Sequence, residues 1–208
     1  MWNAVAKLLL VTFVALAAAG CASVDPVVKI GLVAPFEGRH RAIGYDAIYS
    51  ARMAVREINA AGGVGGHRVA LVALDDRADA ELARQAAASL VVDPGMIAVV
   101  GHYVTDITEI AAPIYAEGGL PLLAMGAPPF TPTDPAALPP EFLTAYAAIT
   151  PFDEVAGPFA GPTYDAFGLL RAALAKAEES TGEITRASVQ EALGGLEYPG
   201  ITGDVAQP

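Results

Sequence analysis

The side chains that could do chemistry in this chain are few, and they are spread over separate loops. Asp75 and Asp76 are adjacent carboxylates after an apolar run, where acids can hold a metal ion or accept a phosphoryl group. His40, His67 and His102 lack the short spacings of metal-binding histidines. The sequence has no Ser/His/Asp order, no glycine-rich phosphate loop that opens a helix and no cysteine pair. It therefore favours a protein that is not an enzyme and that carries neither cofactor nor metal.

The loops that hold these residues separate short apolar runs, which alternate with stretches of helical character. The apolar runs are Val27–Val33, Val69–Leu74, Met96–Val100 and Leu120–Ala124. The expected helices between them are Tyr45–Ala60, Ala80–Val92 (with Asp79 as N-cap) and Thr105–Glu117. This order predicts an α/β fold with a doubly wound parallel sheet. Such sheets bind ligands in the loops beyond the C-terminal ends of their strands. Those loops are Pro35–Gly44, Asp75–Asp79, Gly101–Asp106 and Met125–Pro129.

The composition changes after Gly126. Residues 127–162 are rich in proline and are expected to form a linker, with a helix near Glu141–Ala148. Two further helices are predicted over Thr163–Glu179 and Arg186–Leu193. The domain plan is therefore an α/β domain at 27–126, the linker, and C-terminal helices within 163–205 that pack back on the domain.

The first twenty residues have the pattern of a secretory signal peptide. A charged Lys7 precedes an apolar stretch, and small residues lead to Gly20 and Cys21. This end resembles a bacterial lipobox, although Ala18 stands where a larger aliphatic residue is usual. Because Cys21 is the only cysteine, we expect lipidation there and anchoring to the outer face of the cell membrane, with a plain periplasmic protein as the alternative.

The net charge is −11, and −12 without Lys7. An acidic surface repels phosphate backbones and anionic lipid headgroups. We therefore expect no nucleic-acid partner and no electrostatic membrane binding.

A family resemblance is carried by Gly44 and four runs. These runs are KIGLVAPFEG (29–38), REINAAGGVGGHRVALVALDD (56–76), GHY (101–103) and PIYAEGGLPLLA (113–124). They resemble the first lobe of the leucine/isoleucine/valine-binding family, which are type I periplasmic binding proteins that deliver solutes to ABC importers. The region around Tyr164 and Asp165 resembles the family's C-terminal part. Family members have two lobes, and the resemblance implies that most of the second lobe is missing here.

The resemblance also implies ligand-binding positions. Thr105 matches a hydroxyl residue that binds the ligand's carboxylate, and Gly126 and Ala127 match backbone groups of the next ligand loop. Ile43 stands where an aromatic residue often flanks the ligand, and Tyr103 could stack on it. Two departures weaken such a site: Pro128 replaces a common threonine, and Asp106 places negative charge beside Thr105.

Structural alternatives stand beside these roles. Thr105 could serve only as a helix cap, Tyr103 could be partly buried, and Tyr164 with Asp165 could anchor the late helix. Asp75 and Asp76 have acidic counterparts without catalytic roles in the family, which favours a structural role.

Three functions follow as hypotheses. The first is a solute-binding lipoprotein of an ABC importer that binds amino acids weakly, with a permease as partner. A homodimer could restore a closed site for its ligand. The second is a membrane-tethered interaction module, and the third is a remnant that folds without a function.

Overall fold

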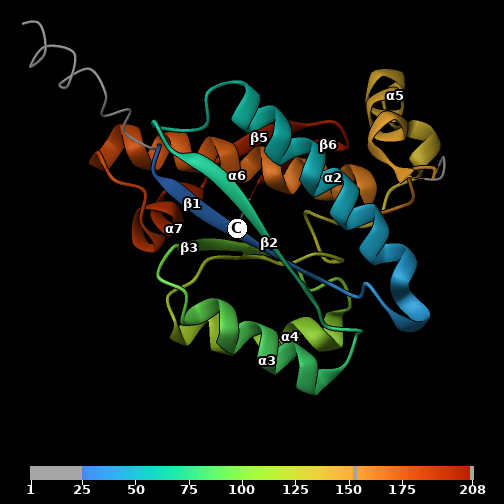
Figure 1. The fold of residues 1–208 in the computed structure, drawn as a ribbon, viewed down its shortest axis with the longest axis horizontal. Helices are drawn as coiled ribbons and strands as arrows, with labels where there is room; N and C mark the ends of the chain where they lie inside the picture. The colour runs from blue at the N-terminus through green and yellow to red at the C-terminus, as the bar shows by residue number, and fades with distance from the viewer. Residues whose placement is uncertain (1–24, 152–153, 207–208) are drawn as a thin grey trace, which may run out of the picture.

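The computed structural model describes residues 25–151 and 154–206. The expected signal peptide and Cys21 lie outside these residues. A four-stranded parallel sheet forms the centre of the molecule, in the order β2-β1-β3-β4 (Figure 1). Its strands are β1 (Val27–Ala34), β2 (Arg68–Asp75), β3 (Met96–Val100) and β4 (Leu122–Leu123). This confirms the predicted α/β fold with a parallel sheet.

Helices cover both faces of the sheet, and this explains why its strands are apolar runs rather than alternating patterns. The helices are α2 (Arg41–Ala60), α3 (Ala80–Val91), α4 (Thr105–Glu117), α5 (Pro140–Ile149), α6 (Ala160–Thr181) and α7 (Arg186–Leu193). Figure 1 shows α3 and α4 below the sheet and α2 and α6 above it. All five residues of the central strand β3 are buried. Within the described residues, no helix combines the length and apolar character that a bilayer crossing requires.

The core has two parts, one on each face of the sheet. The face with α2 and α6 buries Ile30 and Leu32 of β1, and the face with α3 and α4 buries Val33. This division follows from the alternation of side chains along a strand.

The C-terminal helices share the first of these cores. Phe167, Leu170 and Leu174 of α6 are fully buried there, and α6 packs along α2. The Tyr164 hydroxyl donates to Glu57 of α2 across 2.6 Å. Asp165 accepts the backbone N–H groups of Ile201 and Thr202 at 2.8 and 2.9 Å. Tyr164 and Asp165 thus have the anchoring role that we considered.

Two features differ from the sequence-based expectations. The segment 127–162 does not run as a spacer, because it contributes apolar side chains to the core. These are Phe130, Leu138, Phe142, Tyr146 and Phe159. The described residues also end in an antiparallel hairpin of β5 (Glu197–Gly200) and β6 (Gly203–Ala206), which the sequence did not predict as strands. Short 3-10 turns occur at Gly38–His40 (η1) and Pro135–Ala137 (η2).

Candidate functional site

The C-terminal ends of the four strands lie at one edge of the sheet, on the right in Figure 1. The loop that follows β3 closely approaches the backbone of β1 and of the loop that follows β4. Gly101 has φ +145° and packs against the carbonyl of Val33. Gly126 has φ +83°, and a Cβ built on it would lie 2.8 Å from the carbonyl oxygen of Tyr103. Side chains larger than glycine do not fit these two crossings, so the glycines allow the β3 loop to lie against β1 and against the β4 loop.

Thr105 is the first residue of α4 and is exposed at this edge. The N-cap is Val104, so the alternative of Thr105 as an N-cap is wrong. The first N–H groups of an α-helix have no acceptor within the helix, and the helix dipole favours an anion beside them. The hydroxyl of Thr105 therefore lies beside unpaired donors. Asp106 follows it in the first turn, is also exposed, and opposes an anion there.

Tyr103 does not face the solvent at this edge. Its side chain is 3% exposed, its hydroxyl lies 2.9 Å from the Thr163 hydroxyl, and its ring meets Phe159 edge-on at 5.3 Å between centroids. Its ring is therefore a core element that holds the loop against α6, and the expected stacking on a ligand is not available in this arrangement. Tyr103 is therefore more deeply buried than the partial burial that we considered from the sequence.

Gly126 and Ala127 each form a backbone hydrogen bond within their own loop. The Gly126 N–H donates to the Phe130 carbonyl at 2.9 Å, and the Ala127 carbonyl accepts the Phe130 N–H at 2.8 Å. Among the hydrogen bonds of the described residues, none involves the Gly126 carbonyl or the Ala127 N–H. The neighbouring Pro128 is exposed and has no N–H to offer.

Ile43 lies in the first turn of α2 rather than in the expected loop. It is half-buried and packs against the core next to the sheet. An apolar side chain at this place can border a ligand but offers no polar contact.

A buried polar chain lies directly behind this edge. The His102 Nδ1 atom is 2.6 Å from Asp76 Oδ2, and its Nε2 atom is 3.2 Å from the Tyr115 hydroxyl. The second Asp76 oxygen accepts the Ala78 N–H at 2.9 Å. Asp76 and His102 were both noted in the sequence, but nothing in their spacing indicated that these two side chains from separate loops are in contact.

Asp75 has an equally structural role, as expected. Its Oδ1 atom accepts the N–H groups of Phe36 at 2.8 Å and Arg77 at 2.9 Å. The guanidinium of Arg77 pairs with Glu37 and with Asp75. The Arg77–Glu37 ion pair joins the loops that follow β1 and β2. Arg39 and Arg41, in the same region, are exposed.

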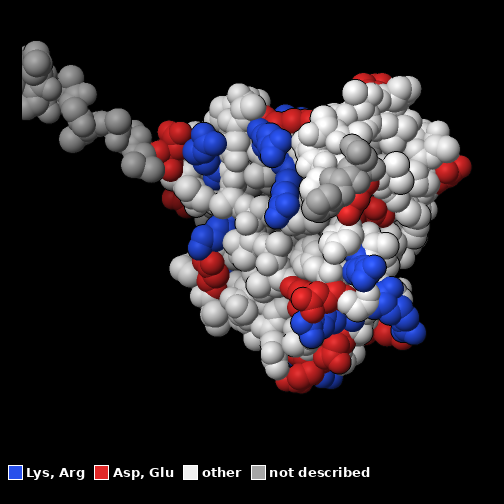
Figure 2. Space-filling model, turned by 45° about the vertical axis from the view of Figure 1, so that its right-hand side comes forward, with Lys and Arg blue, Asp and Glu red and all other residues white. Residues whose placement is uncertain are grey.

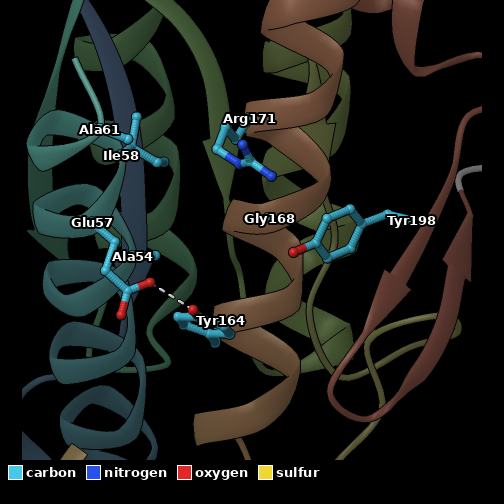
Figure 3. A pocket seen from close by; sticks show the side chains of 8 residues that line it. All are labelled: Ala54, Glu57, Ile58, Ala61, Tyr164, Gly168, Arg171 and Tyr198. Atoms are coloured by element: carbon cyan, nitrogen blue, oxygen red, sulfur yellow. Dashed lines mark hydrogen bonds between the residues drawn. The ribbon is translucent and has the colours of Figure 1, made fainter. Parts of the chain in front are cut away.

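A pocket of about 230 Å³ lies between α2 and α6, away from the C-terminal ends of the strands (Figure 3). Ala54 and Ile58 border it on α2, and Arg171 and the ring of Tyr198 border it on the other side. The Glu57–Tyr164 hydrogen bond crosses one end of it. None of the predicted ligand-binding residues lines it.

The face drawn in Figure 2 carries charges of both signs. Basic side chains form a short stripe above its centre, and acidic and basic side chains are mixed at its lower right. Among the described residues, no group of three or more His, Cys, Asp or Glu side chains could hold a metal ion.

Comparison with known proteins agrees with this architecture. A family model described as "Periplasmic binding protein" matches residues 27–141. An "Amino acid binding protein" of Pseudomonas aeruginosa is 35% identical over 99 residues, which are 48% of this chain and 26% of that protein. A "Leucine-specific-binding protein" of Salmonella typhimurium is 33% identical over 122 residues, or 59% of this chain and 32% of that protein. The matched part thus spans a third or less of these relatives.

A solved structure shows the same fold. The structure of a putative branched-chain amino acid ABC transporter from Rhodospirillum rubrum superposes with a TM-score of 0.73 at 19% identity. The match covers 85% of this chain and 92% of that one. It therefore includes residues beyond the region that the family model matches.

Proposed function

The chain belongs to the periplasmic binding protein family, and from this premise we propose that it is an extracytoplasmic solute-binding protein whose ligands are amino acids of the branched-chain type. The relatives named above bind amino acids or leucine by their descriptions, and they are binding proteins rather than enzymes. These relationships support the ligand class.

One observation carries the proposal: the exposed N-terminus of α4 and the Gly126–Ala127 loop meet at the C-terminal edge of the sheet. An amino acid could place its carboxylate against Thr105 and the first N–H groups of α4. Its ammonium could reach the Gly126 carbonyl. This supports Thr105, Gly126 and Ala127 as polar contacts and Ile43 as an apolar border.

We expect the affinity to be low. The described residues form one lobe, so a ligand at this edge keeps one side in water, where each polar contact is weaker. Micromolar binding corresponds to about −8 kcal/mol, and half of that energy gives roughly millimolar binding. A second copy that covers the edge would raise the affinity by excluding water.

We also propose that the protein is exported and held at the membrane by a lipid on Cys21, close to an ABC permease as partner. Metabolic labelling with a fatty-acid analogue tests the anchor. Label on the wild type but not on Cys21→Ala is the expected result, and label on both would contradict it.

A second candidate is an interaction module that binds no solute. Asp106 in the first turn of α4 and the burial of Tyr103 favour it, because the first repels a carboxylate and the second removes an aromatic contact. The hydrogen-bonding groups left at Gly126 and Ala127 favour solute binding instead.

Titration with leucine, followed by two-dimensional NMR, separates the two candidates. Solute binding predicts saturable shifts at the Thr105 and Ala127 amides and smaller shifts with leucinamide, which lacks the carboxylate. Shifts confined to the pocket at Arg171, or none at any position, would contradict the proposed site.

A further inference from the structure

The buried chain from Asp76 through His102 to Tyr115 lies directly before Thr105. We propose that His102 is a positioning residue of the ligand site, which fixes the Gly101–Thr105 loop so that Thr105 and the N-terminus of α4 face the edge of the sheet. Its effect on binding rests on the proposed function, whereas its effect on the loop can be measured without any ligand.

Burial excludes a direct role for His102 in ligand contact. The side chains of His102 and Asp76 are 0% and 1% exposed, so no solute can touch either ring nitrogen or the carboxylate. Both ring nitrogens and both carboxylate oxygens have partners at 2.6 to 3.2 Å. A satisfied polar chain in a dry environment allows very few alternative arrangements, because each lost contact leaves a buried polar atom unpaired.

The partners determine where the protons lie. Burial raises the pKa of the Tyr115 hydroxyl, so it keeps its proton and can donate to His102 Nε2. With Nε2 as the acceptor of this bond, the ring proton lies on Nδ1 and is donated to Asp76. This is the less common tautomer for an exposed histidine. Its detection would therefore be direct evidence of the hydrogen bonds from Asp76 through His102 to Tyr115.

The backbone of the same loop is fixed as well. The His102 carbonyl accepts the Thr108 hydroxyl at 3.0 Å, and the Gly101 N–H donates to the Leu123 carbonyl at 3.1 Å. The side chain of His102 therefore joins the end of β2 to α4, its carbonyl is held by α4, and the neighbouring Gly101 N–H joins the ends of β3 and β4. A displaced His102 would carry Thr105 with it, since only two residues separate them.

Tyr115→Phe tests the inference because it removes one hydroxyl and keeps the ring. Tyr146→Phe is the matched control: Tyr146 is 1% exposed and lies in the other part of the core, on α5. With ¹⁵N-labelled histidine, we expect the wild type to show His102 protonated at Nδ1. Tyr115→Phe should shift the Nε2 signal, shift the Thr105 and Asp106 amides, and speed amide exchange in the loop about tenfold. Tyr146→Phe should do none of these.

Binding supplies the second measurement. If the wild type binds leucine, Tyr115→Phe should weaken that binding about fivefold and Tyr146→Phe should leave it unchanged. Protonation of His102 at Nε2, or Thr105 amides that respond equally to both variants, would overturn the inference. If the wild type binds no amino acid while the loop responds only to Tyr115→Phe, the proposed function fails and the positioning of the loop by His102 stands.

Discussion

The guanidinium of Arg186, at the start of α7, donates across 3.0 Å to the backbone carbonyl of Gly118, at the end of α4. The same side chain donates to the carbonyls of Val91, Asp93 and Met96 at 2.7 to 2.9 Å. A single cation thus satisfies carbonyls at the ends of two helices, where the helix dipole favours positive charge. Through it, the C-terminal part of the chain is fixed to the opposite side of the sheet.

Arg186→Lys should therefore destabilise the protein, because an ammonium cannot reach four carbonyls with the planar geometry of a guanidinium. We expect a loss of about 2 kcal/mol in the free energy of unfolding, measured by urea denaturation. Arg171→Lys, on the exposed side of α6, is the control and should change it by less than about 0.5 kcal/mol. Equal effects of the two substitutions would show that the Arg186 contacts contribute little.

Asp46 should make stability depend on pH. It is buried on α2 and accepts the N–H groups of Gly157 and Phe159 at 3.0 and 3.2 Å. Burial raises the pKa of the Asp46 carboxyl to about 6. The folded protein thus holds this proton at pH values where the unfolded chain has released it. The resulting contribution to stability is fully present below pH 4 and is lost as the pH rises through 6.

Asp46→Asn removes this titration. It also costs one acceptor, so we expect the variant to be less stable than the wild type at pH 4. The difference should shrink by about 2–3 kcal/mol between pH 4 and pH 7, because a pKa shift of two units corresponds to that energy. Denaturation curves at four pH values measure it. A difference that stays constant with pH would contradict the shifted carboxyl.

Gly126→Ala tests the crossing of the two ligand loops. Gly126 has φ +83° and its Cβ would meet the Tyr103 carbonyl, whereas Gly182 has φ +74° and open space around it. Alanine at a positive φ costs about 1 kcal/mol at either place. Gly126→Ala should cost at least about 1 kcal/mol more than Gly182→Ala in thermal or chemical unfolding, because a carbonyl must also move. Equal costs would mean that the loops can separate freely.

Thr105→Ala tests the carboxylate contact. If the hydroxyl binds a carboxylate, its removal should weaken leucine binding about tenfold while stability changes little, since Thr105 is exposed. Thr144→Ala, at an exposed threonine on α5, is the control and should bind like the wild type. Calorimetry or NMR titration measures both. Undiminished binding by Thr105→Ala would remove this residue from the site.

The sequence predicted the strands and helices closely, because buried runs and helical spacing are local patterns. Met96–Val100, Thr105–Glu117 and Arg186–Leu193 match the structure to the residue. The predicted start of α2 at Tyr45 was four residues late, since the proline- and glycine-rich stretch before it indicated a loop. The β5–β6 hairpin was missed because Pro199 and two glycines interrupt its pattern.

The contacts at the ligand edge were harder to predict, because they join residues that lie far apart in the sequence. Nothing local to His102 indicates Asp76 or Tyr115 as partners, and nothing local to Arg186 indicates four carbonyls in three other segments. Tyr103 was considered as a ligand contact or a partly buried side chain because it follows a strand in a ligand loop, yet it is buried and hydrogen-bonded to Thr163 of α6. The ligand-binding role of Thr105, Gly126, Ala127 and Ile43 remains a prediction.

The most direct test of this account is calorimetry on residues 22–208, which include every described residue, with leucine, isoleucine, valine and other amino acids as titrants. Light scattering on the same sample gives the mass. We expect saturable binding of a branched-chain amino acid, with a roughly millimolar dissociation constant for a monomer and tighter binding for a dimer. A folded protein that gives no heat of binding with any amino acid would contradict it.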